Sequence, residues 1–338
     1  MFGLKDLKEQ LEASSSKIIC PVLGCKRSVA RMKAGVWNSL DSSLKSGETD
    51  GKTFDRYFCS DHGIYITPST FIYRNLRDNL LWPDADGELL EQVVAAKRVK
   101  AQLHHDNSED AVTWNVFRYL ERNGLIGLFL GSVTKTPLNS RPVVYWSYSQ
   151  EDKGTYPRLV DACDMFGERA TRRSEPDLLI ATDNALFFIE AKLTSGNETS
   201  GRGARLKEHL LNVKRYISGY DNWFSRAFAS DYEMIVRDQK YELMRFWLIG
   251  TYMAQLDNLD FYFINLVTST RETDIENDFG KHLRQDKRRH FLRMTWESIY
   301  SFVRERGPAG EDKSKMIGYF QNKATRYEQG RIQRAFSV

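Results

Sequence analysis

Two carboxylates and a lysine come close together in one short segment of the chain, EPDLLIATDNALFFIEAKL. The Asp-Asn pair in its middle can form the two-residue loop of a β-hairpin. In that register Asp177 directly faces Glu190, and Lys192 points to the same face of the sheet two residues further on. Two carboxylates within such apolar runs need a compensating cation or a raised pKa. Mg²⁺ or Mn²⁺ satisfies that need, and a lysine beside a metal-bound water suits phosphodiester hydrolysis.

These residues resemble the signature of the PD-(D/E)XK nuclease superfamily, which has Pro-Asp on one strand and Glu-x-Lys on the next. The matching residues are Pro176-Asp177 and, after twelve intervening residues, Glu190-Ala191-Lys192. The resemblance implies an α-β-β-β-α-β core and cleavage of nucleic acid that depends on a divalent metal. It also implies that Asp177, Glu190 and the backbone carbonyl of Ala191 bind the metal, and that Lys192 is the catalytic lysine.

Many members of the superfamily add a glutamate from the helix that precedes the sheet. Glu109, in NSEDAVTWNVFRYL, best fits that place, and Ser108 before it is a natural N-cap. The alternative for Glu109 is a charge in the first helical turn that acts only locally. Lys192 also has a purely structural alternative, which is an ion pair across the strands with Glu175.

Three cysteines and a histidine near the amino terminus have the spacing of a structural zinc site. Cys20 and Cys25 form a C-x4-C pair, and Cys59 and His62 form a C-x2-H pair after a gap of 33 residues. Two such pairs of sulfur and nitrogen ligands predict a tetrahedral Zn²⁺ that helps this module to fold. The alternative is a set of buried free cysteines and one histidine held by ordinary hydrogen bonds.

The composition is that of a folded protein without a membrane segment. Of the 338 residues, 41% are hydrophobic and 28% are charged, and no apolar run approaches the roughly 18 residues of a membrane span. The amino terminus lacks a signal-peptide pattern, and four cysteines do not make a disulfide scaffold. We therefore expect a cytoplasmic protein. Residues 281–338 contain 14 Lys or Arg against 6 Asp or Glu, which suits a polyanionic partner such as nucleic acid.

The hydrophobic patterns predict an α/β protein. An amphipathic helix is expected over residues 1–13, and the apolar runs that begin with LIGLFLG at Leu125 are expected to be strands. The residues His104-His105-Asp106 are expected to form a solvated linker. By its resemblance, the core is restriction-endonuclease-like, with a mixed sheet flanked by helices.

The chain is expected to have four parts. They are a zinc-finger-like module with an amino-terminal helix (1–80), a connecting helix (81–104), the PD-(D/E)XK nuclease core (105–270) and a basic helical carboxy-terminal section (271–338).

The function expected from these features is a metal-dependent nuclease, a DNA endonuclease of the restriction, defence or repair type. Double-strand cleavage usually requires two active sites, which favours a homodimer. One alternative is a non-catalytic, zinc-bearing adaptor that binds nucleic acid on a nuclease fold. Another is a metal-dependent phosphohydrolase that acts on small nucleotides.

Overall fold

A computed structural model describes residues 5–46, 51–97, 102–198, 203–217 and 222–338. The chain forms two compact units, and the second interrupts the first in the sequence. The first unit comprises Met1–Glu88, Val99–Asn123 and Glu297–Val338, and the second comprises Leu89–Arg98 and Gly124–Trp296. The four parts expected from the sequence, with their boundaries, stay a prediction.

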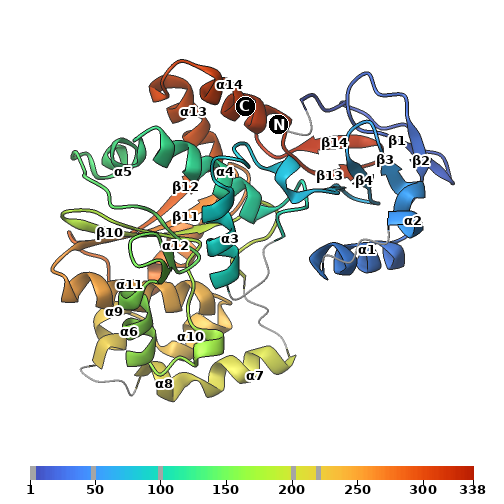
Figure 1. The fold of residues 1–338 in the computed structure, drawn as a ribbon. Helices are drawn as coiled ribbons and strands as arrows, with labels where there is room; N and C mark the ends of the chain where they lie inside the picture. Colours follow the sequence, from blue (N-terminus) through green and yellow to red (C-terminus); the bar gives the residue numbers. More distant parts are fainter. Residues whose placement is uncertain (1–4, 47–50, 98–101, 199–202, 218–221) are drawn as a thin grey trace. The chain divides into compact units, whose positions relative to one another are not determined.

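The second unit is built on a seven-stranded mixed sheet with the strand order β12-β11-β10-β9-β6-β7-β8 (Figure 1). Strands β10, β11 and β12 are parallel to one another, whereas β9 is antiparallel to β10 and β6 is antiparallel to β9. The strands are β6 Val144–Tyr145, β7 Tyr148–Ser149, β8 Gly154–Thr155, β9 Leu178–Ala181, β10 Ala185–Ala191, β11 Asp260–Val267 and β12 Arg289–Thr295.

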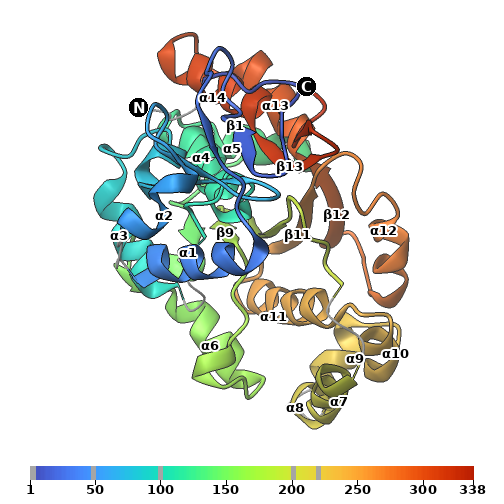
Figure 2. The ribbon, with the colours of Figure 1, turned by 90° about the vertical axis from the view of Figure 1, so that its right-hand side faces the viewer.

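Helices cover both faces of this sheet (Figures 1 and 2). Helix α11 packs against β10 and β11 on one face, and α5 lies on the other side. Among the described residues, no helix combines the length and the apolar character required to cross a membrane. The helices of this unit are α3 Gly87–Ala96, most of which belongs here, α5 Ile126–Thr134, α6 Pro157–Met165, α7 Gly203–Leu211, α8 Val213–Ile217, α9 Trp223–Ala227, α10 Tyr232–Arg237, α11 Tyr241–Leu256 and α12 Ile275–Asp278.

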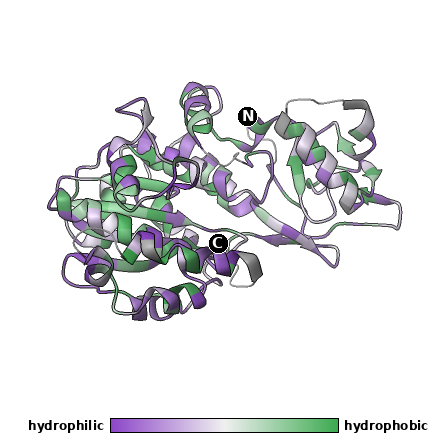
Figure 3. Ribbon diagram, turned by 90° about the horizontal axis from the view of Figure 1, so that it is seen from below, coloured by the Kyte–Doolittle hydropathy of each residue, from purple (hydrophilic) through white to green (hydrophobic). Residues whose placement is uncertain are grey.

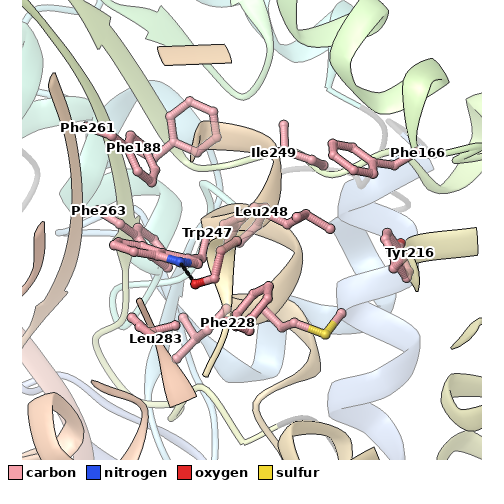
Figure 4. Packing of buried hydrophobic residues seen from close by; sticks show 14 of the residues in the cluster. Phe166, Phe188, Tyr216, Phe228, Trp247, Leu248, Ile249, Phe261, Phe263 and Leu283 are labelled. Carbon is pink, nitrogen blue, oxygen red and sulfur yellow. Dashed lines mark hydrogen bonds between the residues drawn. The ribbon is translucent and has the colours of Figure 1, made fainter. Parts of the chain in front are cut away.

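Aromatic rings fill the space between α11 and the sheet (Figure 4). The ring of Trp247 lies 5.4 Å from that of Phe261, and the ring of Phe246 lies 6.0 Å from that of Phe263. Trp247 Nε1 donates a hydrogen bond to the Ala227 carbonyl at 2.9 Å, so this polar atom is paired although the side chain is buried. The central strands are largely apolar in Figure 3 because both of their faces are covered.

The register predicted for the hairpin is confirmed. Leu186 pairs with Ala181 and Ile189 pairs with Leu178, with the loop at residues 183–184. The Thr182 N–H donates to the Ala185 carbonyl at 2.8 Å and closes the loop. After the hairpin the chain continues through helices α7 to α11 and then strand β11.

The apolar run LIGLFLG, predicted as a strand, is instead the start of α5. Its buried residues are Ile126, Phe129 and Leu130, which follow the i, i+3, i+4 spacing of one helical face, while Leu128 is exposed. A short, continuous apolar run fits either structure, and here the helical spacing decides.

The helix predicted over residues 1–13 is wrong for residues 5–13, which are extended. Leu7 pairs with Val22 and Gln10 with Arg331 in isolated bridges, and Leu7 and Leu11 are buried. A spacing of four residues places side chains on one face of a helix, but also on one face of an extended chain. Backbone pairing with distant residues therefore outweighs the local helical pattern.

The first unit contains three small sheets, β1-β2, β3-β4-β5 and β13-β14. Its elements are β1 Lys17–Ile19, β2 Ser28–Ala30, α1 Ala34–Ser46, α2 Gly51–Phe54, β3 Phe58–Cys59, β4 Ile64–Ile66, β5 Phe71–Tyr73, α4 Glu109–Arg122, α13 Trp296–Arg306, α14 Glu311–Asn322, β13 Ala324–Glu328 and β14 Arg331–Arg334.

His105 and Asp106 are buried in the first unit, so the solvated linker predicted here is wrong. Asp106 Oδ1 accepts hydrogen bonds from Lys323 Nζ at 3.1 Å and from the Tyr73 hydroxyl at 3.3 Å. His105 Nε2 lies 2.7 Å from Asp41 Oδ1. Lys323 lies near the carboxy terminus, so no local sequence pattern reveals its contact with Asp106.

The section 271–338, predicted as a basic helical section, contains strands as well as helices. It contains three α-helices, but β12 joins the seven-stranded sheet and β13 and β14 form a hairpin. The sequence of β12, RHFLRMT, carries arginines because it is an edge strand, where charged side chains are tolerated. These charged residues interrupt the run of apolar residues from which a strand is predicted.

We expect Gly250→Ala to destabilise the second unit. A Cβ at this position in α11 would lie 2.0 Å from Cζ of Phe261, so the ring must move. Such overpacking costs about 1–3 kcal/mol, more than the gain of about 0.5–1 kcal/mol from replacing glycine in a helix. Urea unfolding followed by circular dichroism should give a lower midpoint. The control is Gly318→Ala in α14, where a Cβ meets nothing within 4 Å. A midpoint for Gly250→Ala equal to that of the control would contradict this packing.

Candidate active site and cysteine cluster

The hairpin places the two predicted carboxylates opposite each other. Hydrogen-bonded and non-hydrogen-bonded pairs alternate along antiparallel strands. Because Thr182 and Ala185 form a hydrogen-bonded pair, extending the register puts Asp177 and Glu190 at a non-hydrogen-bonded position, where facing side chains are closest. The Ala191 N–H donates to Asp177 Oδ2 at 2.8 Å, which holds the Asp177 carboxylate against β10.

Glu190 is a buried carboxylate with one oxygen that lacks a hydrogen bond. Its side chain is 3% exposed, and Oε1 accepts a hydrogen bond from Lys192 Nζ. Its Oε2 accepts none from any residue that the structure describes. Burial, and then the charge of Asp177, hold the pKa of Glu190 well above its usual range.

Lys192 is the positive charge of the site. Burial alone would lower its pKa, but the charges of Glu190, Asp177 and Glu242 outweigh burial and raise it. Lys192 is therefore an ammonium group at neutral pH. One such charge does not balance the carboxylates around it, and either a proton on Glu190 or a further cation can compensate the excess.

Trp146 fixes the second oxygen of Asp177. Trp146 Nε1 donates to Asp177 Oδ1 at 3.0 Å. This tryptophan lies with Ser147 in a tight turn between β6 and β7, and both residues have positive φ. The ammonium of Lys97 lies 4.0 Å from the centre of the Trp146 ring, a cation–π contact that holds the ring in place.

Pro176 removes a backbone donor opposite Ala191. Two residues beyond the last paired residues of β9 and β10, the register places Pro176 opposite Ala191, where two strands would exchange backbone hydrogen bonds. Proline has no N–H, so it gives no hydrogen bond to the Ala191 carbonyl. The N–H and C=O of a strand residue point to the same side, and the Ala191 N–H points at Asp177. The Ala191 carbonyl, predicted to bind metal, therefore lies on the Asp177 side.

A buried hydrogen-bond network of two asparagines and a glutamate lies on the β11 side of Glu190. Asn265 in β11 pairs with Glu190 in the parallel register. Asn265 Oδ1 accepts from Asn197 Nδ2 at 2.7 Å, and Asn265 Nδ2 donates to Glu272 Oε2 at 2.7 Å. Glu272 Oε1 also accepts from the Asn197 N–H at 2.7 Å. The network fixes the segment that follows Lys192.

A second network anchors the segment that leads to Asp177. Glu168 Oε1 accepts hydrogen bonds from the Ser174 hydroxyl at 2.9 Å, the Tyr216 hydroxyl at 2.8 Å and Arg245 Nε at 2.8 Å. Burial would raise the pKa of Glu168, but the charge of Arg245 outweighs it and lowers the pKa. Arg245 also donates to the Arg172 carbonyl at 2.7 Å. The approach to the Pro-Asp motif is thus tied to α11.

The structure places the remaining predicted residues as follows. Glu109 is the first residue of α4, and Ser108 caps this helix by accepting a hydrogen bond from the Ala111 N–H at 3.0 Å. Glu109 belongs to the first unit, so its role at the active site stays a prediction. The ion pair of Lys192 is made with Glu190, whereas Glu175 accepts a hydrogen bond from Ser147 at 3.3 Å.

Sequence reasoning missed Trp146 and Asn265. Asn265 carries a usable signal, because it is a single amide in the apolar run LDFYFINLV. A fully buried polar residue in a strand needs partners, and a neighbouring site can supply them. Trp146 gave no such signal, because its contact with Asp177 depends on the turn between β6 and β7.

The cysteine cluster of the first unit has the dimensions of a tetrahedral metal site. The ligand atoms of Cys20, Cys25, Cys59 and His62 all lie within 4.8 Å of one another. His62 Nδ1 lies 3.5 Å from the sulfurs of both Cys20 and Cys59, and the sulfurs of Cys25 and Cys59 lie 4.0 Å apart. Tetrahedral ligands at Zn–S distances of about 2.3 Å are themselves about 3.8 Å apart. The cluster could therefore bind zinc.

Burial and backbone hydrogen bonds act in opposite directions on the thiols of the cluster. Burial raises the pKa of the Cys20 and Cys59 thiols, whereas hydrogen bonds from the backbone of Val22 and of Asp61 lower it. Lys8 Nζ donates to the carbonyls of Cys20 at 2.8 Å and Cys25 at 2.6 Å. Burial outweighs the backbone hydrogen bonds, so the pKa of both thiols is raised, and a metal would bind here by replacing the thiol protons.

The family of the chain follows from a comparison with family models. The model described as "Restriction Endonuclease associating with ARP" (REase-ARP) matches residues 48–325, which is most of the chain. The chain belongs to the REase-ARP family. No curated protein and no solved structure matches it.

The REase-ARP match covers the whole candidate active site but only half of the cysteine cluster. Cys59 and His62 lie within the matched residues, while Cys20 and Cys25 precede them. The family description points to a nuclease of the restriction-endonuclease type, and the mixed sheet flanked by helices agrees with it.

We expect Pro176→Ala to weaken metal binding at this site. The alanine has an N–H that can donate to the Ala191 carbonyl and compete with a cation for it. A backbone hydrogen bond contributes about 0.5–1.5 kcal/mol, which corresponds to a loss of up to about tenfold in Mn²⁺ affinity. Isothermal titration calorimetry on the full chain measures this. The control is Pro142→Ala, at an exposed proline before β6. Equal affinities for the two variants would contradict the role given to Pro176.

Proposed function

We propose that the chain is a PD-(D/E)XK nuclease that hydrolyses phosphodiester bonds of nucleic acid with a divalent metal, Mg²⁺ or Mn²⁺. The observation that carries the proposal is Glu190 Oε2, a buried carboxylate oxygen without a hydrogen-bond donor among the described residues, opposite Asp177 and beside Lys192. Hard oxygen ligands in a dry, acidic site suit such a cation. The strand order and the crossover through α11 support the α-β-β-β-α-β core.

We propose separate roles in metal binding and in catalysis for the residues of the site. Asp177, Glu190 and the Ala191 carbonyl would hold the cation, with Glu109 as a further proposed ligand. A bound divalent cation polarises a phosphate oxygen and lowers the pKa of a bound water. Lys192 would donate a hydrogen bond to the attacking water and stabilise the negative charge that develops on the phosphate.

We propose DNA as the substrate and a homodimer as the cleaving species. The surplus of basic residues in 281–338 supports a polyanionic substrate. The family description names an association with ARP, and we propose that this chain also has such a partner. A cytoplasmic location agrees with free cysteines.

We propose that the metal of the cysteine cluster is a structural Zn²⁺. Three thiolates and one imidazole are ligands that zinc prefers, and four protein ligands leave no open position for catalysis. The cluster lies among the small sheets of the first unit, whose core includes Cys20 and Cys59. Zinc binding would therefore stabilise that unit directly.

We expect the purified protein to carry about one zinc ion per chain at this cluster. Inductively coupled plasma mass spectrometry should show that Cys59→Ser loses the metal, and its melting temperature should fall. Cys163→Ser is the matched control, because this buried cysteine belongs to the second unit and lies near Ser174 instead. Zinc retained by Cys59→Ser would show that these residues do not form the site.

The proposed activity is tested by cleavage of supercoiled plasmid, linear duplex and single-stranded DNA with and without Mg²⁺. We expect metal-dependent cleavage that falls at least about 100-fold in Lys192→Ala, because a group acting on the attacking water contributes about 10²–10⁴-fold. Glu190→Gln should show a similar loss. The control is Lys207→Ala, at an exposed lysine on α7 of the same unit and outside the basic section 281–338.

The pattern of the results distinguishes the alternatives. Full activity in Lys192→Ala would contradict the role of this lysine. DNA bound by the wild type but not cleaved would favour the adaptor, and cleavage of small nucleotides alone would favour the phosphohydrolase. Salt-dependent binding to long DNA supports a polymeric substrate.

A further inference from the structure

We infer that Glu242, in the first turn of α11, is an additional acidic ligand of the cation at Glu190. The inference rests on the proposed function, because it concerns the same site. It extends the set of ligands from the hairpin to the helix that crosses over it.

The packing of α11 places Glu242 next to Glu190. Along the helix, Gly250 lies over Phe261, where a Cβ would approach the ring to 2.0 Å, and Phe246 lies 6.0 Å from Phe263. Four residues back along α11 thus correspond to two residues forward along β11, since four helical residues rise about 6 Å and two strand residues span about 6.6 Å.

The next step of this series reaches the active site. Four residues before Phe246 is Glu242, and two residues after Phe263 is Asn265. Asn265 pairs with Glu190 in the parallel register and points to the same face of the sheet. Glu242 therefore lies over the row that contains Glu190.

The electrostatics agree with this placement. The charge of Glu242 acts on both partners of the buried ion pair, raising the pKa of Glu190 and of Lys192. With Asp177, three carboxylates surround one ammonium group. This arrangement is repulsive unless a cation or a proton compensates it.

The structure also shows where that cation would bind. Glu190 Oε2 is buried and accepts no hydrogen bond from the described residues, while Oε1 is occupied by Lys192. A divalent cation takes six or more oxygen ligands, so two carboxylates and a carbonyl from the hairpin leave positions for a further oxygen. The Glu242 carboxylate supplies it, directly or through a water.

The alternative for Glu242 is purely local. Acidic residues in a first helical turn interact favourably with the helix dipole, with or without a metal. The two roles differ in one measurable property, because only a ligand changes the affinity for a cation.

The test is Mn²⁺ binding to the full chain without nucleic acid, measured by isothermal titration calorimetry and by electron paramagnetic resonance of free Mn²⁺. We expect Glu242→Gln to weaken Mn²⁺ binding by about 10- to 100-fold. The matched control is Glu233→Gln on α10, which removes one exposed glutamate that pairs with Arg237. Glu190→Gln reports on the proposed ligand itself.

Each outcome decides the inference. If Glu242→Gln binds Mn²⁺ as tightly as Glu233→Gln does, the inference is overturned. If Glu190→Gln binds Mn²⁺ more weakly in the same experiment, the proposed function still stands. A wild type that binds no Mn²⁺ overturns both. If Glu242→Gln is unfolded by circular dichroism, Glu242→Asp replaces it, because that variant keeps a carboxylate on a shorter side chain. We then expect weaker binding than in the wild type, and unchanged binding overturns the inference.

Discussion

The burial of the Glu190 carboxylate opposite Asp177 is the constraint on which the rest of the candidate active site depends. A carboxylate on a side chain that is 3% exposed has lost its hydration, and a second carboxylate across the strands adds repulsion. Lys192 compensates one oxygen only, and the other has no donor among the described residues. An arrangement of this kind is unfavourable in a purely structural sheet and is expected where a protein binds a cation or performs catalysis.

Rigid elements hold the reactive groups from several directions. Trp146 and the Ala191 N–H fix both oxygens of Asp177. The Glu168 network ties the preceding segment to α11, and the Asn265 network ties the following one to β11. Side chains locked by such contacts keep their geometry when substrate binds, which a hydrolytic site requires. The supporting contacts come from β10, β11 and α11, and from the turns and loops that hold Trp146, Glu168 and Asn197.

Local information in the sequence predicted the hairpin, its register and the carboxylates that face each other. It also predicted the Ser108 cap and the four ligands of the cysteine cluster. The errors concern LIGLFLG, where an apolar run fits two structures, and residues 5–13 and Asp106, where distant partners decide. Trp146 was also missed because of a distant partner, since only the folded turn between β6 and β7 brings it to Asp177. The fold class was thus accessible, while the contacts that support the site were not.

The discontinuous first unit has a consequence for biosynthesis. The Leu11 N–H donates to the Gly330 carbonyl and the Ile332 N–H donates to the Glu9 carbonyl, so residues from both terminal regions complete one core. The second unit is encoded entirely between them. On the ribosome, the seven-stranded sheet can fold while the segments around the cysteines still wait for β13 and β14. A nascent chain interrupted before Ala324 would therefore carry the hairpin of the candidate active site without a finished first unit.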